Sequence, residues 1–178
     1  MQDDSVFNES FATMVEQEGT SRWLKSNGTS EQQDEFDAKQ EREAIFTNLV
    51  LNYRERLKKL FSSRENDSEK RTSKMYIFSE LREEFAQLKV ADRSFSSYDQ
   101  WFALQQNNAL LATISTYTQL VPAFRTLLVQ QGGDMERFYD AVRGISELTK
   151  DERYSALHVG NRDLLRDVAR KKILERPI

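Results

Sequence analysis

Residues 45–61 read IFTNLVLNYRERLKKLF, and this stretch decides the fold. Its apolar side chains recur every three to four positions, so they fall on one face of an α-helix. They are Ile45, Phe46, Leu49, Val50, Tyr53, Leu57, Leu60 and Phe61. The pattern predicts the second half of a long helix over about residues 31–62, whose first half is almost wholly polar apart from Phe36.

A second apolar stripe lies in residues 68–89, after the polar break SSRENDSE at residues 62–69. Its members are Met75, Tyr76, Phe78, Leu81, Phe85 and Leu88. Two amphipathic helices joined by a short polar break favour packing as an antiparallel hairpin. We expect such a hairpin here, with the acidic beginning of its first helix projecting into solvent.

Shorter apolar patterns outside the hairpin predict further helices. Their expected ranges are 6–27, 97–104, 108–117, 120–131, 134–148 and 161–174, with a turn or short helix at 150–158. Pro122 fits the first turn of a helix, and the pair Gly132-Gly133 fits a helix end. We expect Gly28 to end the first helix in the left-handed conformation. With no convincing strand or internal repeat, the sequence predicts an all-α bundle of roughly six to eight helices.

Composition is typical of one soluble domain spanning residues 1–178. Hydrophobic residues make up 38% of the chain and charged residues 31%, with only two prolines and six glycines. A formal net charge of −3 provides no strong field for nucleic acid or an anionic membrane, so we expect neither partner. No stretch approaches the ~20 apolar residues of a membrane span. The basic tail after residue 160 is best interpreted as a solvated helix face rather than a phosphate or lipid site.

One short segment carries candidate chemistry: residues 7–19, FNESFATMVEQEG. On a helix, Glu9 lies at the edge of an apolar stripe formed by Phe7, Phe11 and Val15. Such a glutamate serves as a metal ligand, as a buried hydrogen-bonding acid, or as an ordinary first-turn acid favoured by the helix dipole. From the pattern alone, the first-turn acid is the favoured interpretation.

This segment resembles the Asn-Glu-x-Phe-Ala element of gluzincin zinc peptidases, in which a glutamate on a second helix supplies the third protein ligand. More broadly, the chain resembles the C-terminal half of a bacterial family of predicted zinc aminopeptidases. The likeness covers four ordered elements within residues 3–142. They are DDSVFNESFATMVEQEG followed by RWL, YDQWFALQQNNALL, TYTQLVPAFRTLL and GGDMERFYDAV.

The resemblance implies a metallopeptidase in which two histidines of an HExxH helix and a later glutamate hold zinc, while the HExxH glutamate acts as general base. Position by position, only Glu9 carries over as a ligand, and Asn8 is expected to orient its helix. The chain has one histidine, His158, and no cysteine, so it cannot build a conventional zinc site alone. We interpret the sequence as truncated after an upstream HExxH segment, and expect it to bind no zinc and to be inactive by itself.

Four other positions are weaker candidates. Tyr117, in a family-like element, could donate a hydrogen bond to the oxyanion of the reaction, as tyrosines do in related zinc aminopeptidases; a half-buried core tyrosine is the favoured alternative. Asn107 and Asn108 could bind a peptide substrate, although an N-cap pair is favoured. His158 is expected to be a surface or capping residue.

The resemblance also implies a peptide substrate and a periplasmic, lipid-anchored intact protein. An absent HExxH helix would bare an apolar groove beside Phe7, Phe11 or Val15. The chain could then form a homodimer through this groove, or cover the groove with its own helices. The alternative function is a non-catalytic helical interaction module, whose long acidic helix over residues 31–62 binds a partner through its polar half.

Overall fold

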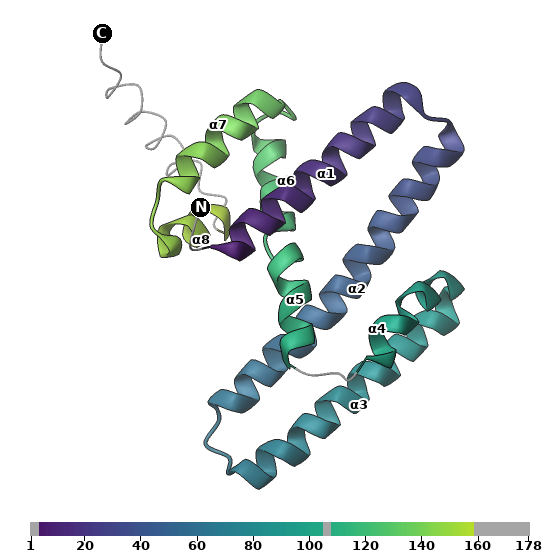
Figure 1. Ribbon diagram of the computed structural model, residues 1–178, viewed down its shortest axis with the longest axis vertical. Helices are drawn as coiled ribbons and strands as arrows, with labels where there is room; N and C mark the ends of the chain where they lie inside the picture. Colours follow the sequence, from purple (N-terminus) through teal and green to yellow (C-terminus); the bar gives the residue numbers. More distant parts are fainter. Residues whose placement is uncertain (1–3, 105–107, 159–178) are drawn as a thin grey trace. The chain divides into compact units, whose positions relative to one another are not determined.

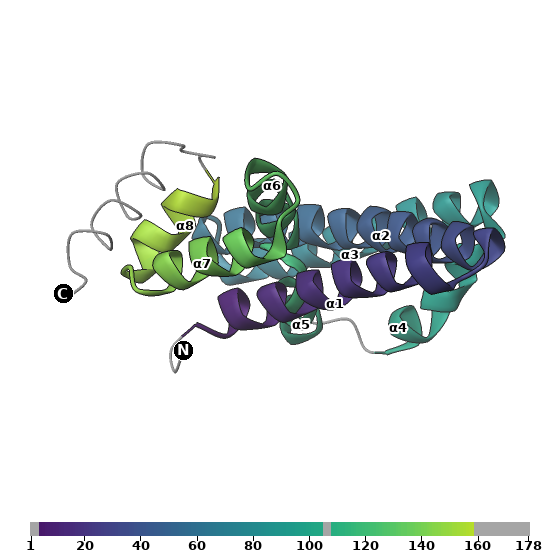
Figure 2. The ribbon, with the colours of Figure 1, turned by 90° about the horizontal axis from the view of Figure 1, so that it is seen from above.

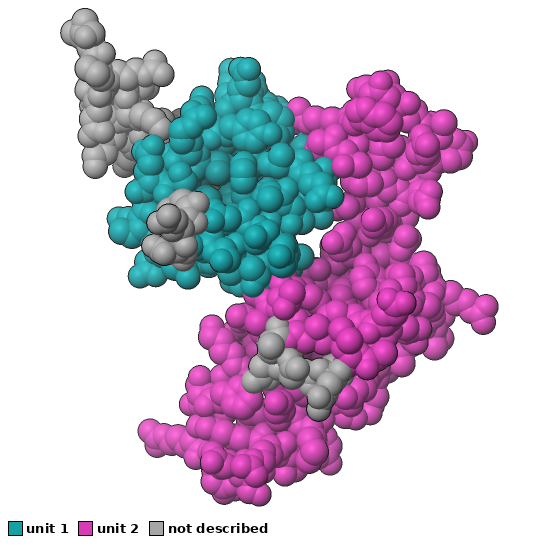
Figure 3. All heavy atoms as spheres, in the orientation of Figure 1, with its two compact units in different colours: residues 1–18, 116–178 teal, residues 19–115 magenta. Residues whose placement is uncertain are grey.

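The computed structural model describes residues 4–104 and 108–158, and it confirms the all-α fold, with no strand in these two ranges (Figure 1). The chain divides into two compact units (Figure 3). Unit 1 comprises residues 1–18 and 116–178, and unit 2 comprises residues 19–115. The expectation of a single domain stays a prediction.

Unit 2 is built on the expected antiparallel hairpin of α2 (Ser30–Ser62) and α3 (Asp67–Ala91), which lie side by side in two views (Figure 1, Figure 2). A capping box begins each helix, formed by Thr29 with Gln32 in α2 and by Asn66 with Glu69 in α3. These caps satisfy backbone N–H groups that would otherwise lack a partner. The polar break between the helices therefore ends α2 and also supplies the N-cap residue, Asn66, that begins α3.

The core of unit 2 is rich in aromatic side chains. After α3 the chain continues as a 3₁₀ helix, η1 (Arg93–Tyr98), and a short helix, α4 (Asp99–Ala103). Aromatic side chains of both elements pack against the hairpin. The Tyr98 ring stacks on Phe46 at a centroid distance of 4.1 Å, and Phe102 stacks on Phe85 at 3.9 Å. The apolar stripe of residues 45–61 thus faces this core as expected, with the exception of the exposed Ile45 and Phe61.

Helix α1 (Ser5–Asn27) begins in unit 1 and ends in unit 2. The expectation that Gly28 takes the left-handed conformation at its end is wrong, because the only glycines with positive φ among the described residues are Gly132 and Gly133. The reason for a glycine at position 28 is space. A Cβ added there would lie 2.8 Å from the Leu24 carbonyl oxygen, to which the Gly28 N–H donates a hydrogen bond.

Unit 1 combines the first turns of α1 with α6 (Val121–Gln130), α7 (Met135–Ser146) and α8 (Lys150–His158). Phe124 of α6 is fully buried and makes edge-to-face contacts with Phe7 of α1 and Phe138 of α7. The φ angles of +70° at Gly132 and +76° at Gly133 form the tight connection between α6 and α7. The remaining helix among the described residues, α5 (Asn108–Thr118), leads into α6.

Most predicted boundaries agree with these helices to within two residues. Pro122 lies in the first turn of α6 as expected, and residues 150–158 form a helix rather than a turn. The predicted final helix over residues 161–174 lies outside the described residues. Within the described part of the chain, no helix has the length and apolarity that crossing a membrane requires.

Candidate functional site

The Asn-Glu-x-Phe-Ala element forms the second turn of α1. Asn8 and Glu9 are half-buried, whereas Ser10 is fully buried and Phe11 packs against the core of unit 1. Ala12, one helical turn from Glu9 on the same side, is exposed. Glu9 therefore lies at the boundary between the core and solvent.

The apolar stripe next to Glu9 is covered by unit 1 itself. Phe7 is buried, and Phe11 and Val15 are half-buried against the same core cluster. The Phe11 ring stacks on Phe138 at 6.0 Å and contacts Phe124 edge-to-face at 5.7 Å. All three side chains are at least partly covered by other residues of unit 1. The homodimer stays a prediction.

Ser10 links the Glu9 helix to the segment that carries Tyr117. Its hydroxyl accepts a hydrogen bond from the Leu120 N–H at 3.2 Å and lies 3.5 Å from the Thr116 carbonyl oxygen, to which it donates. Leu120 is the N-cap residue of α6, and its own side chain makes no capping hydrogen bond. Ser10 therefore stabilises the junction of α5 and α6, and it brings two of the four family-like elements into direct contact.

Sequence analysis missed this role of Ser10, although a signal was present. Ser10 lies three residues after Phe7 and four before Met14, which are both buried, so it falls on the core-facing side of α1. A hydroxyl at that position must find a partner in the interior. The partner itself, 110 residues away, has no local signal.

The other predicted site residues have different outcomes. Tyr117 is 46% exposed and lies outside the buried core, and its role toward substrate stays a prediction. Asn107 lies outside the described residues. Asn108 is the first residue of α5 and His158 the last of α8, but their side chains also lie outside the described part, so their roles stay predictions.

The described residues do not form a complete zinc site. Nowhere in residues 4–104 and 108–158 do three or more histidine, cysteine, aspartate or glutamate side chains gather as metal ligands. A carboxylate at an accessible edge, such as that of Glu9, is a suitable single zinc ligand. Among the described residues, Glu9 thus fits one ligand position, and no complete site is formed.

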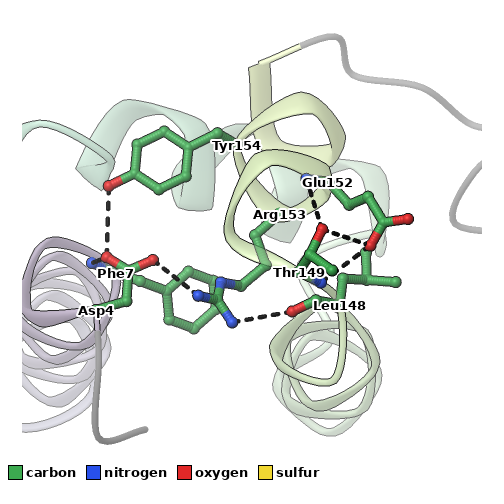
Figure 4. A network of polar contacts seen from close by, with 7 residues as sticks. All are labelled: Asp4, Phe7, Leu148, Thr149, Glu152, Arg153 and Tyr154. Carbon is green, nitrogen blue, oxygen red and sulfur yellow. Dashed lines mark hydrogen bonds and ion pairs between the residues drawn. The ribbon is translucent and has the colours of Figure 1, made fainter.

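A buried polar network lies at the start of the same helix (Figure 4). The Asp4 carboxylate accepts hydrogen bonds from the Phe7 N–H at 3.2 Å, the Arg153 guanidinium at 3.2 Å and the Tyr154 hydroxyl at 3.4 Å. The side chains of Asp4 and Arg153 are 0% and 5% exposed. Burial and the nearby Asp4 charge raise the pKa of Tyr154 above its ordinary value, so its hydroxyl stays protonated as a donor.

Comparison with known proteins supports one assignment. No curated protein and no solved structure matches the chain. A family model described as "Putative aminopeptidase" matches residues 1–157, which include the Glu9 element, the Tyr117 element and both partners of the buried ion pair. Because this match covers most of the sequence, the chain belongs to the putative aminopeptidase family.

Proposed function

We propose that the chain is the helical part of a zinc-dependent aminopeptidase of the gluzincin type, in which Glu9 supplies one protein ligand of the zinc ion. The observation that carries the proposal is the contact made by Ser10. Its two hydrogen bonds hold the Glu9 turn of α1 against the segment that presents the exposed Tyr117. Family membership and the accessible position of Glu9 support the same assignment.

The two histidine ligands come, in this proposal, from an HExxH helix outside these 178 residues, because the chain itself contains a single histidine. A bound zinc ion supplies Lewis-acid polarisation of the scissile peptide carbonyl. The residues of this chain have separate tasks: the Glu9 carboxylate provides negative charge for the ion, and Tyr117 donates a hydrogen bond to the peptide oxygen. The 178-residue chain by itself has no peptidase activity.

The proposed setting rests on the resemblance alone: a peptide substrate and a periplasmic, lipid-anchored intact protein. The family match favours this enzymatic function over a non-catalytic interaction module. Either function uses the same helical scaffold, so an experiment on the ligand, rather than on the fold, separates them.

The experiment uses the full-length protein encoded by the reading frame that contains this chain. We expect an HExxH motif, one equivalent of zinc by elemental analysis, and hydrolysis of a chromogenic aminoacyl substrate. Glu9→Gln keeps the shape of the side chain but removes its charge, and should weaken zinc binding by about 100-fold or more and suppress hydrolysis.

Two variants serve as controls. Glu16→Gln changes an exposed acid two turns further along α1. His158→Ala removes the one histidine of these 178 residues while leaving the HExxH histidines in place. Both variants should leave zinc affinity and hydrolysis near wild type. Full zinc affinity in Glu9→Gln, or stoichiometric zinc on the 178-residue chain, would contradict the proposal. So would a reading frame without HExxH.

A further inference from the structure

The buried ion pair between Asp4 and Arg153 connects the two ends of the described chain, which are 149 residues apart in sequence. Arg153 makes contacts on three sides. Its guanidinium donates to the Asp4 carboxylate and to the Leu148 carbonyl oxygen at 3.0 Å, and it lies over the Phe7 ring at 5.6 Å. A planar guanidinium can satisfy such partners together, whereas a lysine ammonium cannot reproduce the fork.

Stability alone does not account for this pair. Removing two charges from water costs about as much as their attraction returns, so well-packed apolar replacements are often neutral or stabilising. Buried ion pairs contribute instead to the choice of one arrangement over its competitors in several proteins. A role for this pair in fixing the position of one structural element fits this pattern.

The element it places is the beginning of α1. Asp4 is the residue before α1, and its carboxylate caps the Phe7 N–H. Arg153 is itself fixed, because Thr149 and Glu152 form reciprocal hydrogen bonds that begin α8 (Figure 4). The start of α1 is thus held by a second helix whose own start is capped.

Glu9 lies on α1, five residues after Asp4. At 1.5 Å per residue this is about 7.5 Å along the axis, so the rigid first turns transmit any shift of the cap to the Glu9 carboxylate. Metal ligands need support of this kind, since partners that orient a ligand commonly affect metal affinity about 10- to 100-fold when they are removed.

We propose that Asp4 and Arg153 are positioning residues, which hold the first turns of α1 so that the Glu9 carboxylate has one defined place. This inference rests on the proposed function for the role of Glu9. The structural claim, that Asp4 and Arg153 fix the first turns of α1, concerns only the described residues. It can be tested independently of any role of Glu9.

The first arm uses the 178-residue chain and amide hydrogen exchange by NMR. The double variant Asp4→Asn/Arg153→Met removes both charges while asparagine retains a capping oxygen. We expect the Phe7 and Asn8 amides to exchange about tenfold faster or more, while the Phe124 amide in the unit 1 core changes little. The Asn8 N–H donates to the Asp4 carbonyl oxygen, so both amides report on this turn.

A matched control exists in the same unit. Asp134 caps α7 through the Arg137 N–H and faces the Arg137 side chain at 3.9 Å, but this pair is exposed. Asp134→Asn/Arg137→Met makes the same chemical change, and the Arg137 and Phe138 amides should exchange within about threefold of wild type. Arg153→Lys keeps the positive charge but cannot donate to two partners with the geometry of a planar guanidinium. Amide exchange at Phe7 and Asn8 should therefore accelerate by an intermediate amount.

Unchanged exchange at Phe7 and Asn8 in the double variant would overturn the proposal. If the double variant does not fold, Arg153→Lys decides: wild-type exchange in it would overturn the requirement for a guanidinium, and faster exchange would support it.

The second arm measures zinc affinity of the full-length protein by competition with a chelator. We expect Asp4→Asn/Arg153→Met to weaken zinc binding about 10- to 100-fold, and the exposed control pair to have no effect. If Glu9→Gln weakens zinc binding but the double variant does not, positioning is wrong and the proposed function stands. If Glu9→Gln has no effect, the proposed function fails, and the exchange arm alone decides whether the pair holds α1.

Discussion

Units 1 and 2 are both helical, but different contacts hold them. Unit 2 is assembled from neighbours in sequence: α2 and α3 form a hairpin, and η1 with α4 folds straight back onto it with stacked rings. Unit 1 is assembled from the two ends of the chain. Its helices meet through buried polar contacts over sequence separations of 110 residues, at Ser10 and Leu120, and 149 residues, at Asp4 and Arg153.

This difference has an energetic consequence. A hairpin closes a short loop, whereas contacts between distant residues must offset a larger loss of chain entropy. A buried polar group also costs free energy whenever its partner is removed. We therefore expect unit 1, which carries Glu9, to be sensitive to small polar changes, while unit 2 depends mainly on apolar packing.

The largest effect is expected where the distant parts of unit 1 meet, at Phe124. Phe124→Ala removes a fully buried ring that contacts Phe7, Phe11 and Phe138, and should lower the free energy of unfolding by about 3–5 kcal/mol. Urea denaturation followed by circular dichroism measures it. Val129→Ala, on the same helix but 72% exposed, should stay within about 0.5 kcal/mol of wild type. A loss below about 1 kcal/mol in Phe124→Ala would show that this core is not well packed.

A smaller effect is expected from one hydroxyl. Ser10→Ala leaves the buried Leu120 N–H without its acceptor and should cost about 1–3 kcal/mol in the free energy of unfolding. The matched change in unit 2 is Ser79→Ala, because Ser79 is exposed and its hydroxyl donates to the exposed Glu83; the change should cost less than about 0.5 kcal/mol. Equal costs for the two serines would remove the contrast between the units.

The smallest effect is the change in the stability of unit 2 with pH as Tyr53 titrates. Burial, together with the hydrogen bond to Glu84, raises the pKa of Tyr53 to about 12. Because its pKa is higher in the folded state than the ordinary value of 10.0, the folded state holds this proton longer, and the stability it contributes is present below pH 10 and is lost as pH rises toward 12.

By pH 11 the loss should be about 1 kcal/mol, seen as a falling urea midpoint. Tyr53→Phe cannot titrate, so its midpoint should fall less steeply over the same pH range. Tyr98 and Tyr154, whose pKa values are also raised, remain in both proteins and supply the common background. Parallel pH curves for the two proteins would rule out this contribution of Tyr53.

The candidate site was predictable to a limited degree. Glu9 was identified by resemblance, since its pattern alone favours an ordinary first-turn acid. That Tyr117 is exposed could not be read from its spacing, because a residue at a helix end faces solvent or core according to where the next helix turns. Asp4 and Arg153 showed no signal at all, since each resembles a charged surface residue in its own segment.

What the sequence by itself determined is local. The 3.6-residue stripe of residues 45–61, the caps at Thr29 and Asn66, and Pro122 specify helices and their boundaries, because helix periodicity and capping depend on side chains within one or two turns. Only the tertiary structure decided that Ser10 bonds to Leu120 and that Asp4 meets Arg153. Those contacts join segments more than 100 residues apart, and the desolvation that makes a buried hydroxyl or charge need a partner arises only after the helices have packed.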